Sequence, residues 1–220
     1  EGTLREFVPL DVSEAALRDA VAALSADYRM LAIHGVVGDF TEHLGRIPGQ
    51  TPRIVAFLGG TIGNLFPDER ASFLAGLRDT LDAGEWFLLG TDLVKDPNIL
   101  VPAYDDAAGV TAAFNRNVLA VLNRQLGADF DVQSYEHLAV WDPDNEWIEM
   151  RLRSMVPARV SLSELDLDIV VEAGEEIRTE ISAKFRRQGV KHELAKAGFS
   201  LDCWWTDHEG RFALSLARAR

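Results

Sequence analysis

The chain has 220 residues, 47% of them hydrophobic, so it can hold one large domain, or one domain with a sizeable insertion, around a real core. Acidic residues outnumber basic ones by 35 to 22, and the net charge of −13 argues against duplex nucleic acid or an anionic membrane as a partner. A single cysteine, Cys203, excludes an internal disulfide and a cysteine-rich zinc site. With no apolar run of about 18 residues and no signal pattern at the start, we expect a cytoplasmic protein.

The first part of the chain alternates apolar segments with segments of helical periodicity. Strands are predicted over residues 5–11, 31–39, 54–58 and 86–92, and helices over residues 13–24 and 67–81. Ser13 is a candidate N-cap, because a serine hydroxyl at that position can accept the free N–H groups of a first helical turn. Strands that alternate with helices in this way predict an α/β fold with a mostly parallel, doubly wound sheet.

The segment that follows the third strand is the most informative part of the sequence. The apolar run 54–58 stops at Gly59 and Gly60, a turn follows, and Asn64 is its polar group before the helix begins. In open α/β sheets, ligands bind at the carboxyl ends of such strands. We therefore expect a binding site at this loop.

Acidic residues stand at the ends of three of the predicted strands, namely Asp11, Asp39 and Asp92. Because the carboxyl ends of parallel strands share one edge of the sheet, three acids there suggest a ligand with hydroxyl and amine groups. The alternative is that each acid only caps the helix that follows it.

The pattern changes after residue 97 and indicates an α+β insertion over residues 98–185. A long helix is predicted there, followed by five candidate strands: 111–126 for the helix, then 137–142, 146–154, 158–162, 167–171 and 176–185. A helix over 185–196 and a final hairpin of strands 201–206 and 212–217, with its turn at 207–210, return to the first domain. The prediction is one domain of residues 1–97 and 186–220 with a substrate-binding insertion of residues 98–185.

The last strand of this insertion alternates cleanly. Its two predicted faces are Ile177, Thr179, Ile181 and Ala183 on one side, and Arg178, Glu180, Ser182 and Lys184 on the other. Glu180 and Ser182 would then project side by side, and an acceptor beside a hydroxyl could bind a planar group with two N–H functions. Periodicity alone favours the alternative, a solvated strand face.

The sequence gives no sign of a metal site or of a hydrolase. No two of its five histidines have a spacing typical of metal ligands, and neither a Gly-x-Ser-x-Gly motif nor a phosphate-binding Walker loop occurs. Met150 lies on an apolar strand face and by default fills the core. We expect no metal.

Five longer segments together resemble one enzyme family. Residues 57–64, 89–96, 103–117, 146–153 and 179–185 closely resemble the S-adenosylmethionine-dependent histidine Nα-methyltransferases, and the resemblance covers essentially the whole chain. It implies a class I methyltransferase (Rossmann-like) fold with a substrate-binding insertion, S-adenosyl-L-methionine as cofactor and L-histidine as substrate. The implied reaction places three methyl groups on the α-amino group and gives hercynine, an intermediate of ergothioneine biosynthesis.

The resemblance also implies roles for single residues. At the cofactor, Asp11 resembles the acid that binds the ribose hydroxyls, and Asp39 and Phe40 resemble residues at the adenine. Glu180 and Ser182 resemble the pair that reads the imidazole nitrogens, which shifts the interpretation of their strand face toward function.

The substrate's amine and carboxylate are assigned in the same way. Gly59 and Asn64 resemble the residues that contact the substrate amine and carboxylate, with Asn64 as the positioning residue. Tyr104 resembles a tyrosine that binds the carboxylate. Thr61, Phe114 and Met150 resemble pocket-lining positions, and no dedicated general base is identified.

One family feature is missing, and it keeps other functions open. Members of the family carry an N-terminal region with a glycine-rich cofactor loop, and nothing before Arg5 supplies one, so the chain is expected to start at the second strand of a larger sheet. The missing segment could be a separate chain. The alternative function is a catalytically incompetent remnant that binds a histidine-like amino acid. A nucleotide-dependent oxidoreductase is a weaker alternative function, because no dinucleotide fingerprint is present.

Overall fold

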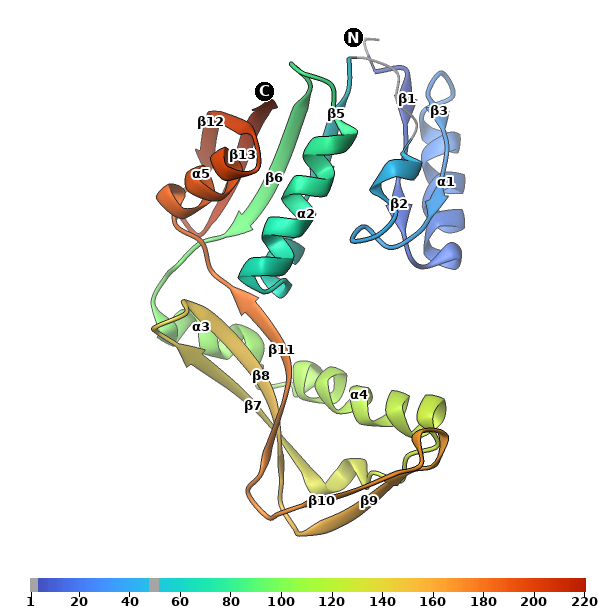
Figure 1. Cartoon of the computed structure of the whole chain (residues 1–220), viewed down its shortest axis with the longest axis vertical. Coiled ribbons are helices and arrows are strands. Elements are labelled where there is room, and N and C mark those ends of the chain that lie inside the picture. Colours follow the sequence, from blue (N-terminus) through green and yellow to red (C-terminus); the bar gives the residue numbers. More distant parts are fainter. Residues whose placement is uncertain (1–3, 48–51) are drawn as a thin grey trace.

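The computed structural model describes residues 4–47 and 52–220 and shows two lobes, one above the other in Figure 1. The upper lobe contains a four-stranded sheet with strand order β12-β13-β6-β5. Its strands are β5 (Ile54–Phe57), β6 (Trp86–Asp92), β12 (Phe199–Thr206) and β13 (Phe212–Ala219). β5 and β6 are parallel, whereas β13 is antiparallel to both β6 and β12. The α/β class is therefore as predicted.

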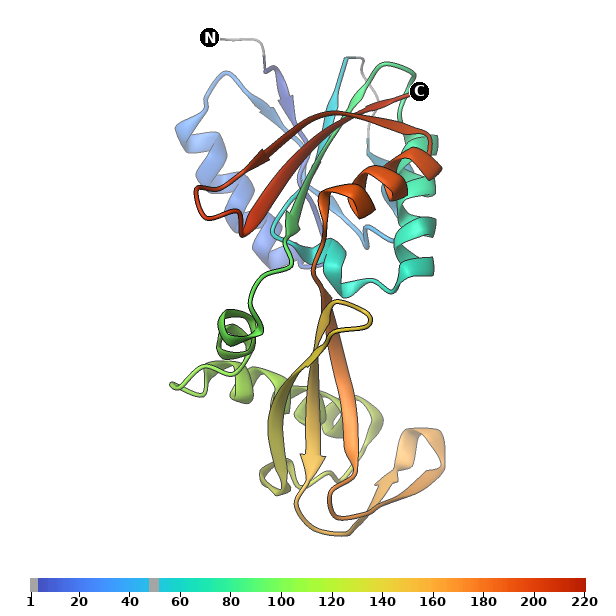
Figure 2. The same ribbon diagram turned by 90° about the vertical axis from the view of Figure 1, so that its left-hand side faces the viewer.

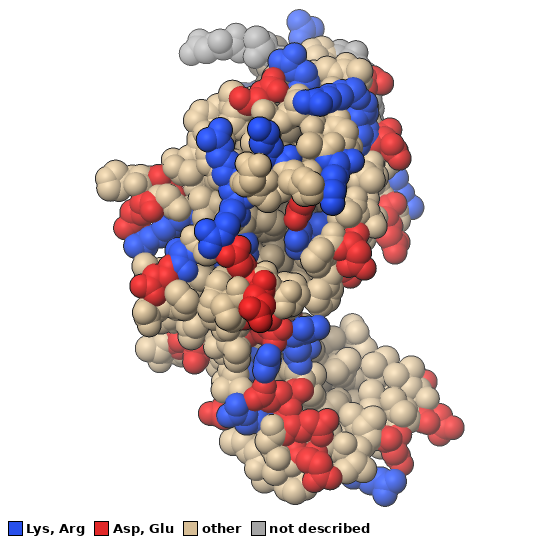
Figure 3. All heavy atoms as spheres, turned by 60° about the vertical axis from the view of Figure 1, so that its left-hand side comes forward, with Lys and Arg blue, Asp and Glu red and all other residues tan. Residues whose placement is uncertain are grey.

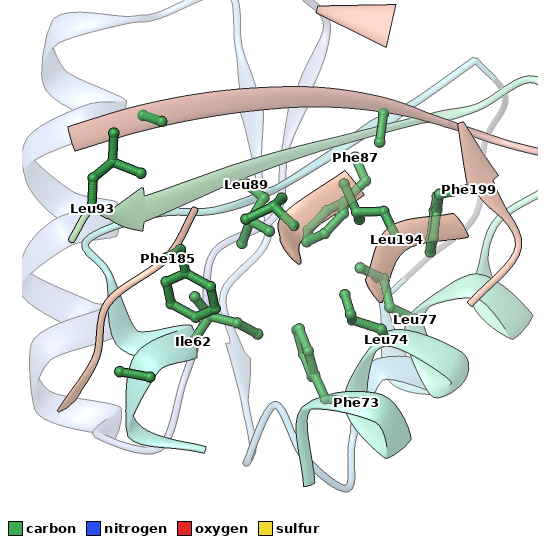
Figure 4. Close-up of a cluster of buried hydrophobic side chains, with 14 of the residues drawn as sticks. Ile62, Phe73, Leu74, Leu77, Phe87, Leu89, Leu93, Phe185, Leu194 and Phe199 are labelled. Carbon is green, nitrogen blue, oxygen red and sulfur yellow. The ribbon is translucent and has the colours of Figure 1, made fainter. Parts of the chain in front are cut away.

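Two helices and this sheet enclose one apolar core, drawn in Figure 4. α2 (Pro67–Thr80) contributes Leu77 and α5 (Arg187–Lys196) contributes Leu194, and both side chains pack with Phe87 and Phe199 from the sheet; all four are fully buried. α2 starts where the sequence predicts, at a proline in the first turn, with Glu69 accepting the backbone N–H of Phe66 at 2.7 Å. This core holds the carboxyl ends of β5 and β6 in place.

The N-terminal part forms two small parallel pairs beside a helix. β1 (Glu6–Phe7) pairs with β3 (Ala32–Ile33), β2 (Leu10–Asp11) pairs with β4 (Val36–Val37), and α1 is Glu14–Asp27. The predicted continuous strands 5–11 and 31–39 are thus wrong in detail. Each is interrupted midway, at Pro9, which lacks a donor for the ladder, and near Gly35. Ser13 does cap α1, accepting the N–H of Ala16 at 3.2 Å.

Within the described residues, β5 hydrogen-bonds to β6 and to no other strand of a sheet. The N-terminal pairs therefore do not extend the main sheet, and the predicted single doubly wound sheet is present only in pieces. The parallel β5–β6 pair and the two N-terminal parallel pairs are the parts that match the prediction.

The lower lobe is built from residues that the sequence assigns to the insertion. Its elements are α3 (Pro97–Tyr104), α4 (Val110–Leu126), β7 (Tyr135–Asp142), β8 (Trp147–Ser154), β9 (Ala158–Leu162), β10 (Leu167–Val171) and β11 (Glu176–Ala183). β11, β8 and β7 form an antiparallel sheet in that order, and β9 pairs with β10 in a separate hairpin. α4 packs on β7 and β8 around a second apolar core that includes Leu119, Tyr135 and Leu152.

α3 is a helix that the sequence analysis does not predict. Asp96 is its N-cap and accepts the N–H of Asn98 at 2.8 Å, and Pro97 occupies the first helical position. An aspartate followed by a proline is a standard signal for a helix start. Pro102 inside the same segment hides it, because proline normally argues against a helix interior.

The start of α4 depends on one carboxylate. Asp106 accepts the backbone N–H groups of Thr111 at 2.7 Å and of Val110 at 3.1 Å, and these bonds lower its pKa to about 2. An acid whose pKa is lowered by folding stabilises the folded state at pH values above its unfolded pKa of about 3.9. This stabilisation is lost as the pH falls toward about 2.

Asp106→Ala should therefore fray the first turn of α4 at neutral pH, as acid does in the unchanged protein. Hydrogen exchange of the Val110 and Thr111 amides measures this. The matched control is Asp105→Ala at the exposed neighbouring acid, which should leave both amides protected. Equal protection in the two variants would show that Asp106 is not the cap.

The two lobes are joined by two chain crossings that lie side by side. The N–H of Phe185 donates to the carbonyl of Asp92 at 2.8 Å, and the N–H of Val94 donates to the carbonyl of Phe185 at 3.1 Å. In Figure 2 the β11 strand runs upward through this junction into α5. Trp147, Ile181 and Ala183 from the lower lobe belong to the upper core, so the root of the insertion sheet is fixed against the main sheet.

Charge is distributed differently over the two lobes on the face drawn in Figure 3. Basic and acidic side chains are mixed over the upper lobe, whereas Asp and Glu side chains gather toward the lower end of the insertion. Across residues 4–47 and 52–220, no helix has the length and apolar character needed to cross a membrane.

Candidate active site

The glycine turn after β5 has the backbone geometry that its sequence requires. Gly59 and Gly60 have φ values of +86° and +80°, which residues other than glycine rarely adopt. A short 3-10 helix, η2 (Thr61–Asn64), follows them. Thr61 and Asn64 are exposed, and their side chains make no hydrogen bond to the described residues. The loop thus offers open backbone and an open amide at the carboxyl end of a strand.

The same loop lies directly against β11. A Cβ atom added at Gly63 would stand 2.7 Å from the carbonyl oxygen and 3.2 Å from the nitrogen of Ala183. Only a glycine permits this approach. The loop predicted to hold the amino acid's backbone groups and the strand predicted to read its ring are therefore in backbone contact.

A β-bulge in β11 corrects the predicted strand faces. The register shifts between Arg178 and Glu180, so that Glu180 lies opposite Met150, whereas Arg178 lies opposite Arg151. Arg178 therefore does not share a face with Glu180 and Ser182 as predicted, and Ile177 does not share one with Ile181. Strict alternation fails because a bulge adds one unpaired residue, here Thr179, to one strand.

Tyr104, Ser182 and Lys184 form a tight polar cluster on the corrected face. The hydroxyl oxygens of Tyr104 and Ser182 are 2.8 Å apart, and the Lys184 ammonium donates to the first at 2.7 Å and to the second at 2.8 Å. The Lys184 side chain is fully buried and also pairs with the Asp92 carboxylate at 3.0 Å. The structure thus brings Tyr104 and Ser182 together as a pair joined to a buried cation.

Glu180 stands on the same face and is the open acceptor of the site. Its carboxylate is partly buried and accepts no hydrogen bond from the described residues. Burial raises its pKa, and the nearby Lys184 partly offsets this. Met150, directly opposite on β8, is 5% exposed and forms an apolar wall beside the carboxylate. A partly dehydrated acceptor without a donor is suited to a ligand N–H.

A buried network behind this face holds α3 in position. The His137 ring donates from Nε2 to the carbonyl of Tyr104 at 2.8 Å, and its Nδ1 accepts from the Asn115 amide at 2.9 Å. The carbonyl partner requires the proton on Nε2, and the Asn115 amide donor requires a lone pair on Nδ1. Thr179, the bulged residue, donates to the Asn115 side chain at 2.6 Å. Neither His137 nor Asn115 is predicted as a site residue from the sequence.

The opposite face of the insertion sheet contacts the start of α2. Glu149 is almost fully buried; despite that burial, hydrogen bonds from Arg151, Arg178 and the Trp147 indole keep its pKa low. Arg178 in turn lies over the ring of Phe66, 5.3 Å from its centroid. Since Phe66 follows closely on Asn64, this contact ties the glycine loop to the insertion.

The three predicted strand-end acids have local partners. Asp11 accepts the N–H of Ser13 at 2.8 Å, and Asp39 accepts both the N–H and the hydroxyl of Thr41, which lowers the pKa of Asp39. The capping interpretation fits Asp11, whose partner Ser13 is the N-cap residue of α1, whereas the partner of Asp39 lies in a turn outside any helix. Each acid keeps its Oδ2 without a partner among the described residues. The Asp92 carboxylate forms ion pairs with the ammonium groups of Lys184 and Lys95.

The remaining predicted residues are more scattered. Phe40 packs in the core, with its ring centroid 4.9 Å from that of Phe57 and edge-on to Phe73. Phe114 is 63% exposed on α4. A cavity of about 290 Å³ between α2, α5 and the β7–β8 turn is not lined by any predicted substrate residue. The candidate site is thus an open face between the glycine loop and the insertion.

Comparison with known proteins identifies the family of the chain. The family model of histidine-specific, SAM-dependent methyltransferases matches residues 1–219. Histidine N-alpha-methyltransferase of Mycolicibacterium smegmatis is 57% identical over 214 residues, and that of Mycobacterium tuberculosis is 52% identical over 216. The alignments cover 97% and 98% of this chain and 67% of each relative, so the chain spans about two thirds of their length.

Among solved structures, the PH0226 protein from Pyrococcus horikoshii OT3 has a TM-score of 0.52 and 15% sequence identity, with 98% of this chain and 74% of that chain covered. At this identity the likeness shows a shared fold alone. The family model and the two close relatives show more: this chain belongs to the histidine-specific, S-adenosylmethionine-dependent methyltransferases.

Proposed function

We propose that the protein transfers three methyl groups from S-adenosyl-L-methionine to the α-amino group of L-histidine and so forms hercynine, a step of ergothioneine biosynthesis. The observation that supports this substrate most directly is the open Glu180 carboxylate beside the Ser182 hydroxyl. An imidazole ring presents two nitrogens in one plane, and an acceptor and a hydroxyl two residues apart on one strand face can meet both.

The ring would lie against Met150 with its nitrogens toward Glu180 and Ser182. The backbone of Gly59 and the Asn64 amide, both unobstructed, would hold the amine and the carboxylate. Thr61 and Phe114 would complete the pocket wall. The hydroxyl of Tyr104 is bonded to Ser182 and Lys184, so we place Tyr104 with the ring-reading pair rather than at the carboxylate.

The bound cofactor would supply a methyl carbon made electrophilic by its sulfonium. The residues of this chain would act by position: Asn64 would hold the amine in line, and the glycine loop would leave room as methyl groups accumulate. The amine must lose its proton before each transfer, and with no dedicated base in the site the proton would pass to water. Phe114 could place an aromatic face near the quaternary product.

For the cofactor we propose Asp11, Asp39 and Phe40. The Oδ2 atoms of Asp11 and Asp39 have no partner among residues 4–47 and 52–220 and fit hydroxyl or amine donors of a nucleoside, while the packing of Phe40 against Phe57 and Phe73 leaves it only partly open. We also propose that residues 1–97 and 186–220 form the cofactor-binding domain and residues 98–185 the substrate-binding insertion, in keeping with the two apolar cores.

The test is incubation of the protein with S-adenosyl-L-methionine and L-histidine, followed by mass spectrometry of the amino acid. We expect products carrying one, two and finally three methyl groups on the α-nitrogen. L-Phenylalanine, which has the same backbone groups without ring nitrogens, serves as the control and should remain unmethylated. Histidine binding without methylation in calorimetry would instead favour the binding-only alternative, and no binding of histidine would refute the proposal.

A further inference from the structure

We propose that Lys184 is a positioning residue for substrate recognition: it fixes the Tyr104 and Ser182 hydroxyls so that Ser182 offers its O–H to the substrate ring, and the site therefore takes an azole ring in its neutral form. This inference rests on the proposed function, because it concerns the ring of the bound amino acid. Neither the family's name nor the predicted ring-reading pair assigns a role to this lysine.

The Lys184 ammonium holds both hydroxyl groups in place. An ammonium is a donor only; Lys184 donates to the hydroxyls of Tyr104 and Ser182 at 2.7 and 2.8 Å and forms an ion pair with the Asp92 carboxylate at 3.0 Å. Its two hydrogen bonds and its ion pair all lie inside the protein. With its side chain fully buried, Lys184 acts on these partners and does not reach the substrate itself.

The two hydroxyl groups of the cluster can be arranged in only two ways. Tyr104 and Ser182 bring two O–H groups, and one of these must lie between their oxygens, which are 2.8 Å apart. Each oxygen already accepts from Lys184. The oxygen that accepts twice has no lone pair left, so its own O–H can only point away from the cluster, as a donor to a ligand.

Relative acidity decides which hydroxyl that is. A phenol, with a pKa of about 10, is a better donor than an alkyl hydroxyl, so Tyr104 donates to Ser182. Ser182 then accepts from both Lys184 and Tyr104 and presents its O–H outward. Beside it, Glu180 presents an acceptor. One donor and one acceptor match a ring with one bare nitrogen and one N–H, which is a neutral imidazole.

The two carboxylates and two ammonium groups around the site balance in sign, so hydrogen bonding decides the form of the ring. The groups that face the site are Glu180 on β11, Asp92 and Lys95 at the end of β6, Lys184, and His137 behind Tyr104, whose Nε2 bonds to the Tyr104 carbonyl. An imidazolium would bring a second N–H toward an outward-pointing O–H and a cation toward Lys184. Both are unfavourable, whereas the neutral ring satisfies every donor and acceptor.

The direct test uses L-histidine labelled with ¹⁵N in the ring, bound to the protein and observed by NMR at about pH 5, where the free ring is mostly protonated because its pKa is about 6.5. We expect one protonated and one bare ring nitrogen in the complex. Two protonated nitrogens would overturn the proposal, since Ser182 would then be accepting and Tyr104 would be donating outward.

A binding series separates the role of Lys184 from a general loss of structure. With a ring pKa of about 6.5, only about 3% of histidine is neutral at about pH 5, so its affinity should fall about 30-fold between about pH 7.5 and 5. The affinity for triazolylalanine, whose ring stays neutral over this pH range, is measured in parallel and corrects for the titration of Glu180. In Lys184→Met, the Ser182 oxygen regains a lone pair, and we expect the corrected pH dependence to drop below about fivefold.

The matched control is Lys95→Met, which removes the other lysine at Asp92 but touches neither hydroxyl. It should keep the roughly 30-fold pH dependence of the unchanged protein. The same loss in both variants, or no change in Lys184→Met, would refute the assignment to Lys184. A protein that binds neither histidine nor triazolylalanine would instead contradict the proposed function.

Discussion

Glu180→Ala is expected to raise the KM for histidine by about 100-fold or more, with a much smaller change in kcat. A site built around a ring N–H loses most of its selectivity when the acceptor is removed, and discrimination of this kind can reach about 10⁴-fold. Glu180 is suited to this role because no described residue donates to its carboxylate. Steady-state methylation rates measured against histidine concentration give both constants.

A thermal unfolding curve distinguishes this loss from a folding defect. Burial raises the pKa of Glu180, so the ionised carboxylate is disfavoured in the folded protein above that pKa. A group of this kind costs stability at pH values above the raised pKa, and the penalty shrinks as the pH falls through that pKa and is gone below the unfolded pKa of about 4.3. Glu180→Gln should therefore unfold at the same temperature as the unchanged protein or higher, while its histidine KM rises.

The control is Glu164→Ala, at an exposed acid of η4 (Ser163–Leu165) on the same lobe, which should change neither the KM nor the unfolding temperature. If Glu180→Ala kept a histidine KM near that of the unchanged protein, Glu180 would have no part in reading the ring.

Local sequence signals were sufficient for most elements of this chain. The strand 54–57, the α2 start at Pro67 and the 207–210 hairpin turn each follow from side chains within a few residues. In the turn, for example, Asp207 accepts the N–H groups of Arg211 and Phe212 at 2.6 and 2.8 Å. Such signals depend on local chemistry and survive into the fold.

The misplaced features depend on contacts between distant residues. Thr179 leaves the alternation of β11 because its hydroxyl bonds to Asn115 and to the carbonyl of Met150, and neither partner is visible from the strand's own sequence. A bulge caused by such contacts reverses the faces on either side of it. Periodicity alone therefore placed Glu180 and Ser182 correctly relative to each other and Arg178 wrongly.

Lys184 shows what alternation can suggest and what it cannot. Its position on the Glu180 face follows from the period of two, yet a lysine at a strand end normally reaches into solvent. Its burial depends on Asp92, Tyr104 and Ser182, which come from the end of β6, the end of α3 and β11. The family resemblance pointed to two of these partners but not to the cation between them.

Gly63→Ala is expected to lower kcat/KM for histidine by about 100-fold, because a displacement of about 1 Å in a positioned site can cost that much. The added methyl group would stand 2.7 Å from the Ala183 carbonyl oxygen, which is backbone and cannot rotate away. The loop that holds Asn64 must then move away from β11, where Ser182 and Glu180 lie. Methylation kinetics measure the effect.

Gly76→Ala is the matched control, because nothing lies within 4 Å of a Cβ at that position. Gly76 lies within α2, where alanine is the better helix former by about 1 kcal/mol, so this variant should be at least as stable and fully active. In Gly63→Ala, the affinity for a free azole such as imidazole should fall much less than kcat/KM, since Glu180 and Ser182 stay on an intact strand. Unchanged methylation by Gly63→Ala would mean that the close approach of loop and strand has no part in aligning the amine, and that the two halves of the proposed site act independently.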